Sequence, residues 1–227
     1  MLNFFRKIYY IVRQDLKPSN PVDFNPFISK LKQNLKGPLP GRDAHLKLMN
    51  ENRFRSKIQP NDFTRKSAVL IVFYPYQSGV FLPLILRPPY DGTHGGQMAF
   101  PGGRMEEEDE SLHRTALREA QEEIGIKAID VTVLGTLTQI FIPQSNFWVL
   151  PVVGYLDYRP DFFPDPREVQ SIVEVDIDDL LTDSHIQTRE MNIRGMKFDT
   201  PGYAVNDQWI WGATAIITSE LVELFRK

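Results

Sequence analysis

The chain has 227 residues, of which 42% are hydrophobic and 24% are charged, and this composition is that of a soluble globular protein with one large domain and an appendage. The net charge of −3 argues against a general nucleic-acid-binding protein, which normally carries a basic excess. Because the chain has no cysteine, disulfide bonds, thiol catalysis and cysteine-ligated zinc are excluded, and a cytoplasmic location agrees with this lack.

The N-terminal residues 2–13 combine aromatic and apolar side chains with basic ones, among them Arg6 and Lys7. Because these charges interrupt the apolar run and no small-residue cleavage site follows, we expect no signal peptide. No run reaches the roughly 18 apolar residues that a transmembrane helix needs, so we expect no stable membrane insertion. We predict a short amphipathic helix that packs against its own domain, the alternatives being a membrane-surface contact or a homodimer contact.

A proline-marked loop separates this segment from the next predicted helix. Three prolines within residues 18–26 indicate the loop, and Gly37-Pro38 ends the helix that is predicted over residues 27–35. We therefore divide the chain into an N-terminal helical extension, residues 1–37, and a main domain, residues 38–227.

Short runs of apolar, β-branched and aromatic residues predict strands in much of the remaining chain. Residues 67–74 and 79–87 form the first pair, and the turn around Gln77-Ser78-Gly79 indicates a hairpin. The further predicted elements are strands at 131–140, 147–156 and 170–175, a short helix at 176–181, a hairpin at 191–198 that is broken at Arg194-Gly195, and a final amphipathic helix from Trp211-Gly212 to Phe225. Because strands alternate with inserted helices, we expect an α/β (α+β) fold with a mixed β-sheet between helices.

One more helix is predicted after the loop Phe100-Pro101-Gly102-Gly103. Asp109 can cap its first turn, and Gly125 suits the left-handed position past its end. The helix is supported by apolar residues that recur every four positions, namely Leu112, Ala116, Ala120 and Ile124.

Two glutamates lie at the edge of the helix face that should contact the core. At about 100° per residue, Glu119 and Glu123 point close to the direction of Leu112 and Ala116. Desolvating a carboxylate costs several kcal/mol, and a bound cation reverses that cost. Because Mg²⁺ prefers carboxylate oxygens, waters and substrate phosphates, Glu119, Glu122 and Glu123 are candidate metal ligands, with a solvated acidic helix face as the alternative.

From Glu110 onward the chain resembles the signature of the Nudix hydrolases. That signature reads Gly, five residues, Glu, seven residues, Arg-Glu, an aliphatic residue, any residue, Glu-Glu, any residue, Gly and an aliphatic residue. Here Glu110 is followed, after seven residues, by Arg118-Glu119-Ala120-Gln121-Glu122-Glu123-Ile124-Gly125-Ile126. The departure is the loop between Gly103 and Glu110, which has six residues instead of five, a length familiar from the coenzyme A diphosphatase branch of the family.

The resemblance implies a Nudix-like α/β/α sandwich and a divalent metal ion, Mg²⁺ or Mn²⁺. It implies that Glu119 and Glu123 are the principal metal ligands, that Glu122 assists, and that the Gly103 carbonyl completes the shell.

The same resemblance gives Arg118 a supporting role, in which it pairs with a carboxylate, for instance one in the loop of residues 104–110. A general base is also needed, and Glu119 is one candidate. Glu168, which follows Pro166 in a predicted loop, is a second candidate, its alternative being an exposed loop carboxylate.

A second motif of the coenzyme A diphosphatase branch precedes the signature. Its spacing is kept by Leu84, Arg87, Gly96 and Phe100-Pro101-Gly102-Gly103. The implied substrate-binding residues are Arg87, His94, Gly96 and Gln97. The chain departs from the motif at Pro88 and at Gly92, where the motif has a second arginine, and this loss removes a bidentate phosphate partner. With looser similarity at residues 210–215, the resemblance covers roughly residues 38–225.

The implied function is metal-dependent hydrolysis of the diphosphate bond of coenzyme A or its derivatives, which gives 3′,5′-ADP and 4′-phosphopantetheine or acyl-phosphopantetheine. One alternative is a Nudix hydrolase of another nucleoside diphosphate linked compound, such as ADP-ribose, NADH or a dinucleotide. The other is a non-catalytic Nudix-fold binding or regulatory module. Such modules commonly have a broken signature, whereas this chain keeps all its carboxylates.

Overall fold

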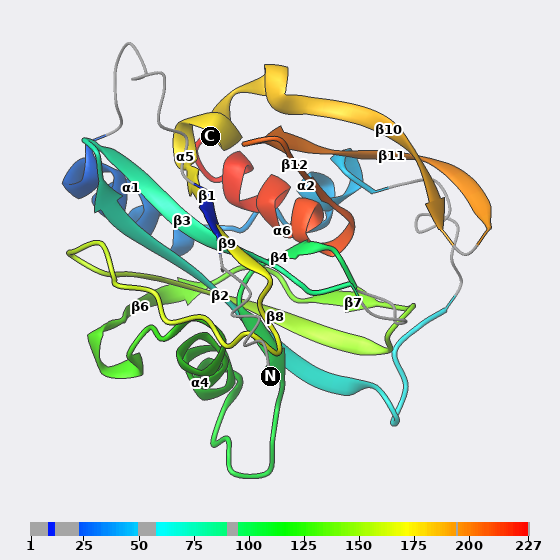
Figure 1. Cartoon of the computed structure of the whole chain (residues 1–227), viewed down its shortest axis with the longest axis horizontal. Helices are drawn as coiled ribbons and strands as arrows, with labels where there is room; N and C mark the ends of the chain where they lie inside the picture. Colours follow the sequence, from blue (N-terminus) through cyan, green and yellow to red (C-terminus); the bar gives the residue numbers. More distant parts are fainter. Residues whose placement is uncertain (1–8, 12–22, 50–57, 90–94, 194, 227) are drawn as a thin grey trace, which may run out of the picture.

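The protein is described from a computed structural model that covers residues 9–11, 23–49, 58–89, 95–193 and 195–226 (Figure 1). Gly92 and His94, which belong to the second motif described above, lie outside these ranges, as do Arg6, Lys7 and Arg194. Within the ranges, no helix is both long and apolar enough to cross a membrane.

A mixed sheet, to which nine strands of the described ranges belong, forms the middle of the molecule. Its order is β1, β9, β3, β2, β8 and β6, and the short strands β4, β5 and β7 pair with β3, β2 and β8 respectively. The bounds are β1 (Tyr9–Ile11), β2 (Arg65–Tyr76), β3 (Gly79–Leu86), β4 (Met98–Ala99), β5 (Gly102–Arg104), β6 (Thr132–Thr136), β7 (Ile140–Ile142), β8 (Phe147–Tyr155) and β9 (Ser171–Asp176). The pairs β1 with β9 and β2 with β8 are parallel, whereas the other pairs are antiparallel.

The second, smaller sheet is antiparallel and consists of β10 (Ile186–Ile193), β11 (Met196–Val205) and β12 (Gln208–Trp211). The helices are α1 (Phe24–Leu35), α2 (Gly41–Lys47), α4 (Leu112–Ile124), α5 (Ile177–Leu181) and α6 (Gly212–Glu223), with the short 3-10 helices η1 (Ala128–Asp130) and η2 (Asp183–His185). In Figure 1, α4 lies on one side of the main sheet, and α6 and the second sheet lie on the other.

Strand β2 runs through the centre of the main sheet and is buried on both faces. Leu70 and Tyr74 point to the face that α4 covers, and Ile71 and Phe73 point to the face that α1 and α6 cover. Alternate residues of a strand point to opposite faces, so one strand contributes to both cores. The predicted fold class, helices on both faces of a mixed sheet, is confirmed.

The prediction of a helix over residues 2–13 is wrong at residues 9–11. These residues form β1, which lies parallel to β9 at the sheet edge, with Tyr9 opposite Ser171. Tyrosine and isoleucine favour strands, and an open sheet edge satisfies their backbone groups. The other residues of the predicted helix lie outside the described ranges.

Helix α1 begins at Phe24, three residues earlier than predicted. Pro26 falls in its first turn, where the missing N–H has no intrahelical acceptor to lose. Phe27 and Leu31 of this helix are buried in the same core as the main sheet, and the two rings of Phe27 and Phe73 pack edge to face. The domain boundary at residue 37 stays a prediction.

Other predicted elements are confirmed with different lengths, and some short elements were missed. The strand predicted at 131–140 is divided into β6 and β7, with an irregular register between Val133 and Gly135. The hairpin around residue 195 has longer arms than predicted, because β10 and β11 pair from Ile186 to Tyr203. The elements that the sequence analysis missed are α2, β4, β5, β12 and the 3-10 helices.

Helix α6 was predicted to be amphipathic, but this prediction is wrong because the helix is buried on all sides. Every residue from Thr214 to Val222 is buried, because α2, the second sheet and the main sheet surround the helix. The charge of Glu220 is satisfied within this core. Its carboxylate lies 2.8 Å from Nε2 of His45 and accepts a hydrogen bond of 2.7 Å from the Thr138 hydroxyl. Burial raises the pKa of Glu220, but these contacts outweigh burial and leave it lowered.

Candidate active site

The glycine loop before α4 lies unusually close to its neighbours. Gly102 and Gly103 belong to β5, which pairs with β2 opposite Val69 and Ala68. A Cβ on Gly102 would overlap the carbonyl oxygen of Ala68, and a Cβ on Gly103 would overlap the carboxylate of Glu119. Only glycine therefore lets this backbone lie directly against the acidic helix.

Asp109 was predicted to cap helix α4, but the N-cap residue is Ser111. The Ser111 hydroxyl accepts a hydrogen bond of 3.3 Å from the N–H of Arg114. Gly125 ends the helix in the left-handed conformation, with φ 78°, as predicted. Asp109 is unavailable as a cap because it binds Arg118 from the side.

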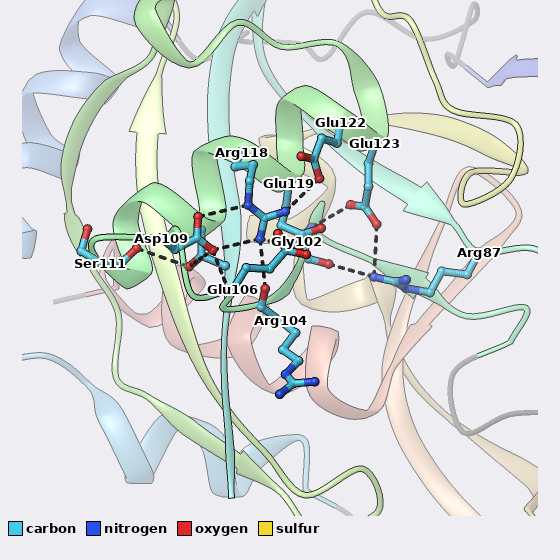
Figure 2. Close-up of polar contacts among 11 residues, drawn as sticks. Arg87, Gly102, Arg104, Glu106, Asp109, Ser111, Arg118, Glu119, Glu122 and Glu123 are labelled. Atoms are coloured by element: carbon cyan, nitrogen blue, oxygen red, sulfur yellow. Dashed lines mark hydrogen bonds and ion pairs between the residues drawn. The ribbon is translucent and has the colours of Figure 1, made fainter.

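Arg118 connects the loop to the helix, as the resemblance implied. Its Nε and Nη2 donate to the two oxygens of Asp109, at 3.1 and 3.0 Å, and Nη2 also donates to the Arg104 carbonyl at 3.0 Å. The hydrogen bonds from Arg118 hold the pKa of Asp109 at about 2. Figure 2 shows this guanidinium between the loop and the acidic face of α4.

Glu123 is the most buried acidic residue of the helix, with a side chain that is 1% exposed. Its Oε2 accepts a hydrogen bond of 2.7 Å from the Gly102 N–H. Its Oε1 accepts no hydrogen bond from the residues that the structure describes and has Nη2 of Arg87 as an ion-pair partner at 3.4 Å. Burial raises the pKa of Glu123 to about 7, although Arg87 and the Gly102 N–H oppose the rise.

Glu119 lies beside Gly103 and is also largely buried, with a side chain that is 13% exposed. Its Oε1 accepts a hydrogen bond of 3.0 Å from Nη2 of Arg118. Burial raises its pKa, and the positive charge of Arg118 opposes that rise. Glu119 and Glu123 are therefore two desolvated carboxylates on adjacent turns, as the helical wheel predicted.

Glu122 points more toward solvent, since its side chain is 59% exposed. Its Oε2 accepts a hydrogen bond of 2.8 Å from Nη1 of Arg118. Both residues line a polar depression of about 350 Å³ on the outer side of α4. Glu122 is thus paired with Arg118 through one oxygen of its carboxylate.

The donors fit a hard divalent cation. The carboxylates of Glu119 and Glu123 are desolvated and of like charge, and the buried Oε1 of Glu123 has an unused acceptor position. Such oxygens suit Mg²⁺ or Mn²⁺. Among the described residues, no three acidic or histidine side chains stand in a metal-binding arrangement, and Glu119 and Glu122 are both paired with Arg118.

The loop of residues 157–170 brings Glu168 to this site. The N–H of Asp165 donates to the carbonyl of Glu123 at 3.0 Å, and the N–H of Phe163 donates to the carbonyl of Ile124 at 2.9 Å. Glu168 is exposed, and burial raises the pKa of both Glu119 and Glu123, with a smaller contribution from the charge of Glu168. The tertiary structure thus places Glu168 on the same side as the two buried glutamates.

Of the residues that were predicted to bind the substrate, Arg87, Gly96 and Gln97 lie close together. The carbonyl of Gln97 accepts a hydrogen bond of 3.1 Å from the N–H of Arg87, and the N–H of Gly96 donates to the Pro88 carbonyl at 3.2 Å. Gly96 and Gln97 thus close the turn that leads into β4 beside Arg87. The predicted residue His94 lies outside the described ranges.

The contact between Arg87 and Glu123 was not predicted from the sequence. These residues are 36 positions apart, on the end of β3 and the last turn of α4, and no local spacing connects them. The hydrogen bond from the Gly102 N–H to Glu123 was also not predicted. The sequence gives a weak indication of it, since a glycine pair before an acidic helix indicates a close backbone approach.

Comparison with known proteins gives a family for the chain. The family model described as NUDIX domain matches residues 64–193. A protein of Yersinia pestis (strain Pestoides F) named "Uncharacterized Nudix hydrolase NudL" is 30% identical over an alignment of 182 residues, and the match covers 76% of this chain and 91% of that protein. Its namesake in Yersinia pseudotuberculosis serotype O:1b (strain IP 31758) matches equally. Among solved structures, the MutT protein of Methanosarcina mazei Go1 is 18% identical, with a TM-score of 0.49 over 76% of this chain and 99% of that one.

Proposed function

Since this chain belongs to the Nudix hydrolase family and acts on the diphosphate bond of a nucleoside diphosphate linked compound, we propose that its substrate is coenzyme A or an acyl derivative. The products are 3′,5′-ADP and 4′-phosphopantetheine, or acyl-phosphopantetheine from a thioester. The observation that supports the hydrolytic site is the buried carboxylate of Glu123, which is held by the Gly102 N–H at one oxygen and accepts no hydrogen bond from the described residues at the other. The substrate itself is supported by the spacing of Leu84, Arg87 and Gly96 before that loop.

We propose that Glu119, Glu122 and Glu123, together with the Gly103 carbonyl, hold Mg²⁺ or Mn²⁺. The ion supplies positive charge that neutralises the diphosphate and lowers the pKa of a bound water. Gly103 is suited to this role because its backbone lies directly against the Glu119 carboxylate.

The other residues of the site orient the acidic helix and move the proton. Arg118 fixes α4 to the loop through Asp109 and therefore acts on the ligands and not on substrate. We assign the general base to Glu168 in preference to Glu119. Glu168 is exposed, so it can release the proton to water, whereas Glu119 is paired with Arg118 and serves as a ligand.

ADP-ribose, NADH or a dinucleotide is the alternative substrate, and the glycine at position 92 supports it, because the second arginine of the coenzyme A motif is missing there. A non-catalytic binding module is less well supported. Such a module has no use for the two desolvated carboxylates, which destabilise the fold when no cation is bound. The proposal also includes a cytoplasmic location, which the lack of cysteine supports.

The test compares substrates directly. The purified chain is incubated with coenzyme A, ADP-ribose and NADH in Mg²⁺ or Mn²⁺, and the products are identified by mass. The expected result is 3′,5′-ADP from coenzyme A at the highest kcat/KM, with a kcat that is about a hundredfold or more lower in Glu123→Gln. A higher kcat/KM for ADP-ribose or NADH would overturn the coenzyme A assignment, and no turnover of any of them with either metal would favour the binding module.

A further inference from the structure

Arg87 directly follows β3 and reaches the acidic helix across the glycine loop. Its Nη2 donates a hydrogen bond of 3.0 Å to the carbonyl of Gly102 and lies 3.4 Å from Oε1 of Glu123. Figure 2 shows the guanidinium approaching the last turn of α4 from the side opposite to Arg118. Arg87 thus provides a positive charge next to the most buried carboxylate of the site.

Gly102 is shared between these two side chains. Its N–H binds Oε2 of Glu123 at 2.7 Å, and its carbonyl binds Arg87. Because one residue contacts both side chains, Gly102 holds Glu123 and Arg87 next to each other in the metal-free protein.

The contact between Arg87 and Glu123 is a weak one. A strong arginine–carboxylate pair has two parallel hydrogen bonds of about 2.7–2.9 Å, whereas here one nitrogen approaches one oxygen at 3.4 Å. Oε1 of Glu123 still accepts no hydrogen bond within the described part of the chain. The Arg87 side chain is 24% exposed, so it can turn toward solvent and exchange its hydrogen bond with the Gly102 carbonyl for water, whereas Glu123 is 1% exposed and cannot.

We propose that Arg87 is the counter-ion of Glu123 in the metal-free protein, and that metal binding displaces its guanidinium from Glu123 and makes it available to the diphosphate of the substrate. This inference rests on the proposed metal-dependent hydrolysis. Two cations compete for one carboxylate oxygen, so the metal and Arg87 weaken each other at Glu123. A diphosphate that binds the displaced Arg87 removes this competition, and metal and substrate therefore bind cooperatively.

The first experiment measures Mn²⁺ alone, without substrate. Calorimetric titrations at pH 8.5 compare the wild type with Arg87→Gln, whose amide can still donate to the Gly102 carbonyl but carries no charge. We expect Mn²⁺ to bind Arg87→Gln about fivefold tighter or more. Arg87→Lys keeps the charge and should stay close to the wild type. Arg114→Ala removes an exposed arginine of α4 and controls for the change in net charge.

Thermal unfolding supplies an independent readout of the same variants. Without metal, the Tm of Arg87→Gln should fall, because Glu123 loses its counter-ion. With saturating Mn²⁺, the gain in Tm should be larger in Arg87→Gln than in the wild type. A purely structural role of Arg87 would lower both Tm values equally.

The second experiment uses α,β-methylene-ADP, a diphosphate that is not hydrolysed, in the presence of Mn²⁺. Since the displaced guanidinium binds phosphate, Arg87→Gln should weaken the binding of this compound about tenfold or more. Equal affinity in the two proteins would overturn the substrate part of the inference.

The outcomes separate the inference from the function on which it rests. If the wild type shows neither heat nor a Tm change with Mg²⁺ or Mn²⁺, the metal-dependent function itself is wrong. If the wild type binds metal, and Arg87→Gln binds it with equal or lower affinity, only the counter-ion role is overturned.

Discussion

Arg118 holds Asp109 with two parallel hydrogen bonds, from Nε to Oδ1 at 3.1 Å and from Nη2 to Oδ2 at 3.0 Å. Asp109 is nearly buried, and its Oδ2 also accepts hydrogen bonds of 3.0 Å from the Thr115 hydroxyl and from the N–H of Glu106. This pair fixes the loop before α4 to the helix that carries the acidic residues. The same guanidinium also reaches Glu119 and Glu122, so the loop and the ligands are connected through one side chain.

Replacing Asp109 should destabilise the protein more than replacing its exposed neighbour Glu108. Asp109→Ala removes several charge-assisted hydrogen bonds, and we expect the free energy of unfolding to fall by roughly 1.5–3 kcal/mol. Urea denaturation of Asp109→Ala and Glu108→Ala measures the difference. The effect should shrink in acid, because the folded pKa of Asp109 is about 2 against an ordinary 3.8 and its contribution is lost as the pH falls through that range. Equal stability of the two variants would contradict the pairing.

Glu123→Gln should fold and lose most of its activity. The amide can still accept from the Gly102 N–H, but it removes a negative ligand, which should lower kcat by about a hundredfold or more at saturating Mg²⁺. Steady-state kinetics with coenzyme A measures the loss, and Glu108→Gln, an exposed glutamate in the loop before α4, is the matched control. Retention of more than about a tenth of the wild-type rate would sink the assignment of Glu123 as a ligand.

The stability of the metal-free protein should fall as the pH rises toward neutrality. Burial raises the pKa of Glu123 to about 7, from an ordinary 4.5, so the folded state binds more protons than the unfolded state between these values. The free energy of unfolding therefore decreases with pH, by up to about 3 kcal/mol across this window. Denaturation in the presence of a chelator, compared between the wild type and Glu123→Gln, isolates this group. Parallel pH profiles of the two proteins would show that Glu123 is ionised without metal.

Arg159→Met should destabilise the protein strongly. Arg159 donates to both oxygens of Glu174, at 2.9 and 2.7 Å, and Glu174 is fully buried and also binds the Tyr74 hydroxyl at 2.8 Å. Removing one partner of a buried ion pair costs about 3–5 kcal/mol, and the partial exposure of Arg159 puts the expected loss at the lower end. Thermal and urea denaturation measure it.

The matched control for Arg159→Met is the double variant Arg159→Met with Glu174→Gln. Since it leaves no unpaired charge in the core, it should recover much of the lost stability. No recovery would mean that Arg159 stabilises the protein through its packing over the rings of Tyr76 and Phe162 and not through its charge.

Glu168→Gln should lower kcat by about a hundredfold or more without weakening metal binding, because a general base contributes to proton transfer and not to the shell. The acidic limb of the kcat profile should also disappear. Glu107→Gln, another exposed loop glutamate, is the control. An unchanged pH profile in Glu168→Gln would indicate that Glu119 is the general base. A loss of Mn²⁺ affinity in Glu168→Gln that parallels the loss of kcat would indicate that Glu168 is a metal ligand.

Much of this site could be predicted because its residues are close in sequence. Helix α4, its glycine end, and the burial of Glu119 and Glu123 follow from the helical period, which any short segment carries in its own residues. The resemblance to the Nudix signature implied that Arg118 pairs with a carboxylate, for instance one in the loop of residues 104–110, and the structure shows that this carboxylate is Asp109. The choice between Asp109 and Ser111 as the helix cap could not be predicted, since both residue types are good caps. The guanidinium of Arg118, which binds Asp109, decides between them.

The sequence by itself determined the identity and spacing of the acidic residues, the mixed α/β class and the family, since these depend on local periodicity and fixed residue order. Only the tertiary structure decided which residues meet across the fold. The pairing of β1 with β9, the burial of α6 on all sides, and the contact of Arg87 with Glu123 depend on strand register and packing between segments far apart in the chain. Their energies come from surfaces that exist only after the chain has folded, and a linear pattern cannot show how those surfaces meet.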